Sequence, residues 1–240
     1  MPDNLFIPSV DLRIGSLEEY NRKQSDKAVT LRKKPKARPC ITISREYGCE
    51  GYHVAELLCD LMMRKTGDEW VLIDKAVLEE VAKRNNISEE ILRTLGANNR
   101  ILNEFMATFS PHWKSDQEYF RLLSRHVVAL AEQGNVIIVE LGGAIITRHI
   151  EHSHHFRIFG SHAFKTASLV RRLKMEPEEA ENLMRRQQKV SDSFTRDFLN
   201  QDDHDPALYH MLFNNARVTP DEIAHAIAAF VSDGNGECSG

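Results

Sequence analysis

Short apolar runs alternate with amphipathic helical patterns from residue 39 onward. The run CITIS at 40–44 is rich in β-branched residues and is typical of a buried strand. Four later runs predict further strands, at 70–74, 136–140, 155–160 and 209–214. Short buried strands separated by helices are typical of a parallel sheet that is covered on both faces. The pattern therefore predicts an α/β fold with a five-stranded parallel sheet and the strand at 40–44 in its centre.

Apolar residues at helical spacing fill the segments between these strands. A first helix follows the opening strand and ends at Gly67, and a long helix is predicted at 115–134 with Ser115 as its cap. The last helix begins with the best-marked signal, in which Thr219 and Glu222 form a capping box. Other helices are predicted at about 75–84, 88–95 and 98–108, with two or three more across 162–199.

Composition narrows the class of protein. The chain has 240 residues, 42% of them hydrophobic and 28% charged, which is ordinary for a soluble globular protein. No apolar run approaches the roughly 18 residues that a membrane span needs. The opening residues, MPDNLFIPSV, lack the basic-then-apolar order of a signal peptide. The four cysteines show neither a metal-type CxxC spacing nor a disulfide framework, so we expect a reducing cytoplasm.

The charge is unevenly distributed along the chain. Residues 1–38 carry nine Lys/Arg against five Asp/Glu, although the whole chain has a net charge of −4. A basic segment of this kind is typical either of a solvated, flexible tail or of an arm for a protein or anionic partner. We expect a flexible tail at 1–38, interrupted by a short helix near 16–27 that Ser16 and Glu19 would cap.

Polar, glycine-containing turns follow several predicted strands. The first runs from Ser44 to Gly51, Asp74 follows the second strand, and Glu140-Leu141-Gly142-Gly143 follows the third. In open parallel sheets the ligand crevice lies at the carboxyl ends of the strands. Glycine lets backbone amides converge on an anion, and the start of a helix adds a partial positive charge. These turns together predict one ligand site, to which Arg45 contributes a cation.

The chain resembles the cytidylate-kinase-like family of P-loop proteins. The stretches that carry the resemblance are ITISREYG with GYHVAELL, VLIDKAVLEEVAKRNNIS, GNVIIVELGGAI, EEAENLMRRQQK and HDPALYHMLFNNARVTPDEIAHAI. They extend over about 39–231, which is nearly all of the chain beyond the tail. The resemblance implies a P-loop NTPase-type, three-layer nucleotide-kinase domain at 39–231. It also implies an acceptor-binding insert at about 75–115, a lid at about 165–198, and a C-terminal tail at 232–240.

The resemblance also implies roles for particular residues. A nucleoside triphosphate with Mg²⁺ would lie on the loop formed by Ser44, Arg45, Gly48, Cys49, Glu50, Gly51, Tyr52 and His53. A nucleoside monophosphate or another small phosphorylated acceptor would face Asp74, Lys75, Gly142 and Gly143. Arg45, Arg185 and Arg186 would stabilise the transferred phosphoryl group. No residue is expected to bind a metal ion directly.

The chain departs from the family pattern at the places where charge matters most. Cys49 and Glu50 replace the serine and second glycine of SREYGSGG, and a carboxylate inside a phosphate loop repels the anion. Gly51 and Tyr52 occupy the positions of the lysine and hydroxyl residue of a Walker loop. Arginines typical of the family are replaced by Gly142, Ser168 and Ser191. Phosphoryl transfer depends on such cations, so their loss predicts slow turnover.

Two functions are compatible with these features of the sequence. The chain is either a kinase that transfers a phosphoryl group to a small acceptor, or a catalytically impaired relative that binds a nucleotide or a partner. In either case we expect the loop amides to converge on phosphate, and Arg45 and Glu50 to oppose one another. A metal site among His149, His152, His154, His155 and His162 is disfavoured, because no second ligand cluster accompanies them. A hydrolase that uses Cys49 is disfavoured too, since no triad partner is evident.

Overall fold

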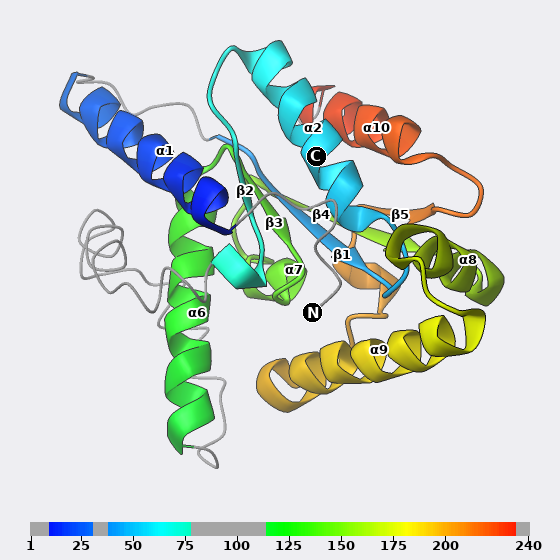
Figure 1. The fold of residues 1–240 in the computed structure, drawn as a ribbon. Helices are drawn as coiled ribbons and strands as arrows, with labels where there is room; N and C mark the ends of the chain where they lie inside the picture. Colours follow the sequence, from blue (N-terminus) through cyan, green and yellow to red (C-terminus); the bar gives the residue numbers. More distant parts are fainter. Residues whose placement is uncertain (1–9, 31–37, 78–113, 234–240) are drawn as a thin grey trace.

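A computed structural model describes residues 10–30, 38–77 and 114–233 of the chain. Its sheet has the order β2-β3-β1-β4-β5, and all neighbouring strands are parallel (Figure 1). The strands are β1 (Cys40–Arg45), β2 (Val71–Ile73), β3 (Val136–Val139), β4 (Ser153–Phe159) and β5 (Met211–Asn214). The predicted α/β fold is confirmed, and β1 lies in the centre of the sheet. Within the described ranges, no helix is long and apolar enough to cross a membrane.

Helices cover both faces of the sheet. One face packs against α2 (Gly51–Thr66) and α10 (Pro220–Asp233), which also contact each other (Figure 1). The other face packs against α6 (Lys114–Gln133) and the short α7 (Gly143–Ile146). Ile41 and Ile43 of β1 point into the first layer, and Cys40 points into the second. A strand buried on both faces has to be continuously apolar, which is why CITIS is readable in the sequence.

Three of the predicted helix ends are confirmed and one is wrong. Gly67 ends α2 with a left-handed φ of 68°. Gly134 ends α6 with a left-handed φ of 70°, and a Cβ there would lie 2.2 Å from the carbonyl oxygen of Arg38. Thr219 and Glu222 form the predicted capping box of α10, with the Thr219 amide donating to the Glu222 carboxylate at 2.9 Å. Ser115 lies inside α6 instead of capping it, because the helix begins at Lys114. The helices predicted at 88–108 lie outside the described residues.

A helical pair lies beyond the carboxyl ends of the strands. It consists of α8 (His162–Leu173) and α9 (Pro177–Leu199), which pack on each other and are followed by a short 3₁₀ turn, η1 (Pro206–Leu208). Leu169, Ala180 and Met184 form a small apolar core between the two helices. This pair corresponds to the segment expected to be a lid, and Figure 1 shows it beside the loop that follows β1.

The N-terminal segment differs from the expected flexible tail over residues 10–30. These residues form a helix, α1 (Val10–Thr30), in which Ser16 is an internal residue instead of the first one. Ile14, Leu17 and Tyr20 are buried in the same apolar core as α6 and β3. The Tyr20 hydroxyl also donates a hydrogen bond to the carbonyl of Gly134. Three buried side chains at helical spacing attach α1 to the domain, so the prediction of a mobile arm is wrong for this part.

A half-buried imidazole, His154, and a buried one, His155, make stability sensitive to acid. Burial, with the nearby His210 as the next cause, lowers the pKa of His154 to about 4 and that of His155 to about 3. The folded state therefore resists protonation that the unfolded chain accepts below its ordinary pKa of 6.5. The stabilisation is present above pH 6.5 and is lost as the pH falls toward 4.

We expect acidification from pH 7 to 5 to lower the free energy of unfolding by roughly 1–2 kcal/mol for each of these two imidazoles. Melting temperatures recorded across this range measure the effect. The variant His154→Gln should flatten the acid limb, whereas His225→Gln, at an exposed position on α10, should leave it unchanged. An acid limb of the same slope in His154→Gln and wild type would contradict this assignment.

Candidate functional site

The loop after β1 donates most of its amides to groups of the protein itself. The Arg45 amide donates to the Glu140 carboxylate at 3.0 Å, and the Tyr47 amide donates to Gln188 Oε1 at 2.8 Å. The Glu50 amide donates to Asn215 Oδ1 at 2.9 Å. The turn survives, with Gly48 at a φ of 102°. The expectation that the loop amides converge on a phosphate stays a prediction, because three of these amides have side-chain acceptors in the structure.

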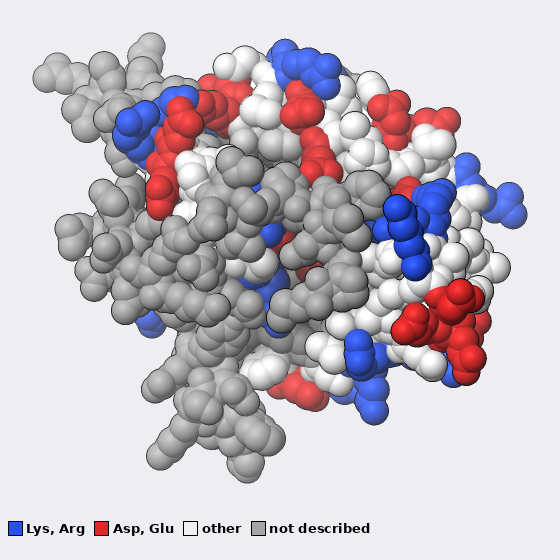
Figure 2. Space-filling model, viewed as in Figure 1, with Lys and Arg blue, Asp and Glu red and all other residues white. Residues whose placement is uncertain are grey.

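Two carboxylates of the loop hold cations from α8. Lys165 Nζ lies 2.7 Å from Glu46 Oε2, and this lysine side chain is only 16% exposed. Arg171 pairs with Glu50, so Glu50 does not oppose Arg45 as the sequence suggested. Figure 2 shows basic and acidic side chains side by side over α8 and α9 on this side of the molecule. The two loop carboxylates thus pair with cations of α8 in the way that the oxygens of a bound phosphate would.

Arg45 contacts Glu140 and Tyr47, apart from the ion pairs that α8 forms with the loop. Its Nε lies 3.8 Å from Glu140 Oε1, and its guanidinium lies 5.4 Å from the centre of the Tyr47 ring. Burial raises the pKa of Glu140, while the nearby Arg45 opposes that rise. Gly51 packs on the Arg45 side chain, because a Cβ there would lie 2.8 Å from Arg45 Cδ. Arg45 therefore lies beside the loop, with its charge directed to Glu140.

The residues expected to bind the acceptor are also engaged. Asp74 follows β2, forms an ion pair with Arg13 of α1, and accepts a hydrogen bond from the Val77 amide at 3.0 Å. Gly142 lies under α9, where a Cβ would approach Leu199 Cδ1 to 2.3 Å. The cavity beside Gly142 measures only about 20 Å³, which is the room of about one water molecule. Gly143 begins α7, and Lys75 is exposed.

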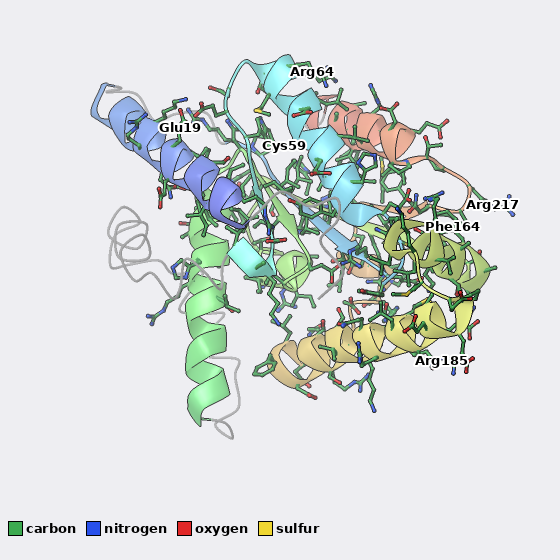
Figure 3. All side chains as sticks on the ribbon, viewed as in Figure 1. Glu19, Cys59, Arg64, Phe164, Arg185 and Arg217 are labelled. Carbon is green, nitrogen blue, oxygen red and sulfur yellow. The ribbon has the colours of Figure 1, made fainter. Side chains whose placement is uncertain are left out.

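A larger cavity of about 350 Å³ lies between α8 and α9. Its lining is mainly basic or polar and includes His162, Lys165, Arg185, Gln188, Lys189, Asp192, Ser193 and Arg196. Gln188 also holds the Tyr47 amide, so this cavity directly adjoins the loop. Arg185 is exposed at its rim, where Figure 3 labels it on α9. Arg186 is exposed on the same helix. Of the two, Arg185 is the one that lines the cavity.

Sequence reasoning missed three side chains that organise this region. Lys165 and Gln188 come from α8 and α9, more than a hundred positions from the loop that they contact, and no local signal marks them. Arg157 was readable as a charge inside the apolar run HFRIFG. It is buried on β4, where its Nη1 lies 3.0 Å from Asp203 Oδ2 and also donates to the Asp203 carbonyl at 2.8 Å.

The site offers little for a nucleophile or a metal ion. Burial raises the pKa of the Cys49 thiol to about 12, so the thiolate is scarce at neutral pH. Asp192, Asp203 and His204 place ligand atoms within 4.8 Å of one another, yet Arg157 already neutralises Asp203. The loop position where a hydroxyl would ligate Mg²⁺ holds Tyr52, whose side chain faces α1. The loop residues therefore do not fit a magnesium ion of the Walker type.

Comparisons with known proteins define the class. The fold, a parallel sheet with a glycine turn between β1 and α2 and a helical pair over the strand ends, is of the P-loop type. The model of the cytidylate kinase-like family matches residues 40–217, and the chain belongs to this family of kinase-like, nucleotide-binding proteins. No curated protein matches the chain.

A solved structure supports the same fold. The crystal structure of an uncharacterized protein from Eubacterium ventriosum ATCC 27560 is similar to this chain, with a TM-score of 0.63. The two sequences are 17% identical, and the match covers 82% of this chain and 99% of the other. At this identity the likeness supports the fold and carries no conclusion about a ligand.

Proposed function

We propose that this protein binds a nucleoside triphosphate, or a related small phosphorylated molecule, and transfers its phosphoryl group slowly or not at all. The observation that carries this proposal is the basic cavity between α8 and α9, which adjoins the loop through Gln188. Phosphate oxygens would be bound by Lys165, Arg185, Lys189 and Arg196, four cations in a recess large enough for a triphosphate. Magnesium would enter with the triphosphate and would find few protein ligands.

The internal ion pairs explain why binding should be weak. A phosphate that binds Lys165 or Arg171 competes with Glu46 or Glu50 for them, so part of the new interaction replaces an old one. The amides of Tyr47 and Glu50 have to leave Gln188 and Asn215 in the same event. We therefore expect a dissociation constant in the high-micromolar range or weaker, on the order of −5 to −6 kcal/mol.

Phosphoryl transfer to a nucleoside monophosphate is the second candidate, and one observation favours it. Arg186 is exposed on α9, and the exposed Arg185 lines the cavity with its guanidinium 3.3 Å from Glu181, a surface pair that a phosphate can replace. Closure of α9 over a bound triphosphate would bring these cations to the transferred group, which is where such charge accelerates the reaction. The acceptor side argues against it, since Asp74 is paired with Arg13.

Calorimetric titration of ATP and CMP against the full chain tests the proposal. Arg45→Ala should weaken ATP binding, because Glu140 would then lie unneutralised beside the loop. Glu50→Gly should strengthen binding several-fold, because it frees Arg171 for phosphate. The control is Arg64→Ala, an exposed cation near the far end of α2 (Figure 3). Unchanged ATP affinity in both Arg45→Ala and Glu50→Gly would mean that the loop is not the phosphate site.

A further inference from the structure

The carboxyl end of α9 and the turn that follows it cover the strand ends of the sheet. In an open parallel sheet these ends border the ligand crevice. Here the crevice is reduced to the cavity of about 20 Å³, which Thr195 and Asp203 line from the side of α9. Ser44 of β1 and Gly142 after β3 line it from the side of the sheet. Figure 1 shows α9 beyond these strand ends, next to α7. Residues 195–209 therefore form a plug segment over the crevice.

Leu199 is the apolar contact of the plug segment. It is 6% exposed and belongs to the same core cluster as Leu141 and Ile145. It packs so closely on Gly142 that a Cβ at this glycine would lie 2.3 Å from Leu199 Cδ1. The glycine that the sequence assigned to an acceptor is therefore covered by a side chain of the protein itself.

Arg157 of β4 holds the plug segment through polar contacts. Its Nη1 donates to the Asp203 carbonyl at 2.8 Å and lies 3.0 Å from Asp203 Oδ2, and its Nη2 lies 2.9 Å from His204 Nδ1. The Tyr209 hydroxyl donates to the same carbonyl at 2.7 Å. The Arg157 side chain is only 3% exposed, and these partners all come from residues 203–209. A buried cation on the sheet thus fixes the position of the segment that covers the crevice.

The backbone beneath Leu199 is strained. Glu140 and Leu141 have left-handed φ values of 67° and 62°, and Gly142 continues them at 65°. Residues with a Cβ avoid this region, and they stay in it only where surrounding contacts hold them. One such contact is the hydrogen bond from the Arg45 amide to the Glu140 carboxylate at 3.0 Å, and another is Leu199 on Gly142. Withdrawal of Leu199 removes one of these restraints, so relaxation of the turn favours an open crevice.

We propose that the plug segment is an autoinhibitory element, which closes the acceptor crevice in the resting protein and is displaced when a phosphorylated acceptor binds. This inference rests on the proposed function, because it concerns the acceptor side of the same site. The Leu199 contact and the Arg157 ion pair hold the closed state, and opening releases the strain at 140–142. A protein binds a ligand more weakly in proportion to the scarcity of its binding-competent state. The acceptor therefore binds weakly to the wild-type chain and more tightly to variants that destabilise the closed state.

Leu199→Ala tests the apolar contact in the full chain. In calorimetric titration it should raise the affinity for CMP at least about tenfold, because the lost contact destabilises the closed state and increases the open fraction. Leu58→Ala is the matched control, since Leu58 is also buried but lies in the α2 layer on the other face of the sheet. Its affinity for CMP should equal that of the wild-type chain.

Asp203→Asn tests the polar contact with less disturbance of the fold. It keeps the shape of the side chain and the backbone carbonyl that Arg157 binds, but it removes the charge of the ion pair. It should therefore also raise the affinity for CMP, and its melting temperature shows whether the fold is intact. Hydrogen exchange followed by mass spectrometry gives a second readout. Bound CMP should speed exchange at 195–209 in the wild-type chain, because the acceptor displaces this segment.

Titration of ATP against the same proteins separates this inference from the proposed function. ATP binding with no gain in CMP affinity in folded Leu199→Ala and Asp203→Asn would overturn the plug segment alone. A gain in CMP affinity in a chain that does not bind ATP would support the plug segment and overturn the proposed triphosphate site. Slower exchange at 195–209 with CMP bound would overturn the plug segment too, since α9 would then close over the acceptor.

Discussion

Replacing Leu17 with alanine should lower the free energy of unfolding by about 3 kcal/mol. Leu17 lies in α1 and has no exposed surface, and it belongs to the same core cluster as Leu130 and Ile138. Its removal leaves a cavity that the rigid sheet behind it cannot close, which is the condition for the larger costs. For a chain of this length the change corresponds to a melting temperature lower by roughly 6–12 °C.

Differential scanning calorimetry of the Leu17→Ala protein measures this effect. Glu18→Ala is the matched control, because Glu18 is the neighbouring position on the exposed side of the same helix. Deletion of residues 1–34 should reduce stability further, since it also removes Ile14, Tyr20 and the ion pair with Asp74. A melting temperature within a degree of wild type for Leu17→Ala would mean that α1 is not attached in solution.

The sheet could be predicted from the sequence because each of its strands carries its own signal. CITIS and NVIIVE are apolar on both faces, and a strand between two helical layers has to be so. The capping box at Thr219 is equally local, because every group it needs lies within four residues. Such features follow from sequence neighbours alone.

The attachment of helix α1 to the core could not be predicted in this way. Ile14, Leu17 and Tyr20 have helical spacing, but they are separated by polar residues and precede the basic run at 22–38. The average charge of the segment suggested a solvated tail, whereas three buried positions are enough to attach a helix to a core. The helical spacing of apolar residues at 10–20 is present in the sequence, but the high average charge of the longer segment favoured the wrong prediction.

The location of the candidate site could be predicted from the sequence, but the contacts between its residues could not. Parallel topology places the ends of β1, β2 and β3 at one edge, and the structure brings Ser44, Asp74 and Glu140 to that edge. The partners of the loop could not be predicted, because Lys165, Gln188 and Asn215 reach it through tertiary packing. The sequence shows that Glu50 carries a charge, and only the fold shows that Arg171 neutralises it.

Supplied with ATP, magnesium and CMP, the full chain should turn over more than about a thousandfold below the roughly 10 per second of an ordinary enzyme. Transfer requires cations that neutralise the phosphoryl group as it leaves, and a single arginine can contribute about 10³ or more in rate. Lys165 and Arg171 are paired with carboxylates of the loop, and Arg172 is held on the Gly48 carbonyl at 3.2 Å. Gly51 and Tyr52 offer no replacement for the lysine and hydroxyl of a Walker loop.

The variant Glu50→Gly shows whether one carboxylate or the whole arrangement limits the reaction. It frees Arg171, but Glu46 still holds Lys165 at 2.7 Å and Asp74 still faces Arg13. We therefore expect tighter ATP binding with less than about a tenfold gain in turnover, because one cation out of several is restored. Chromatographic quantification of ADP and CDP measures both proteins, and Glu179→Ala, which removes an exposed carboxylate from the first turn of α9, is the control.

The affinity for ATP and the turnover rate together distinguish the candidate functions, because Glu50→Gly should change them differently in a binding protein and in a kinase. In a binding protein the affinity for ATP rises while turnover stays near the background, since the acceptor side remains closed by Arg13 and Leu199. In a kinase limited by its loop, both rise together, and CDP forms in proportion to bound ATP. Turnover by the wild-type chain within about tenfold of an ordinary enzyme would show that the pairs with Glu46 and Glu50 open readily when the substrates bind.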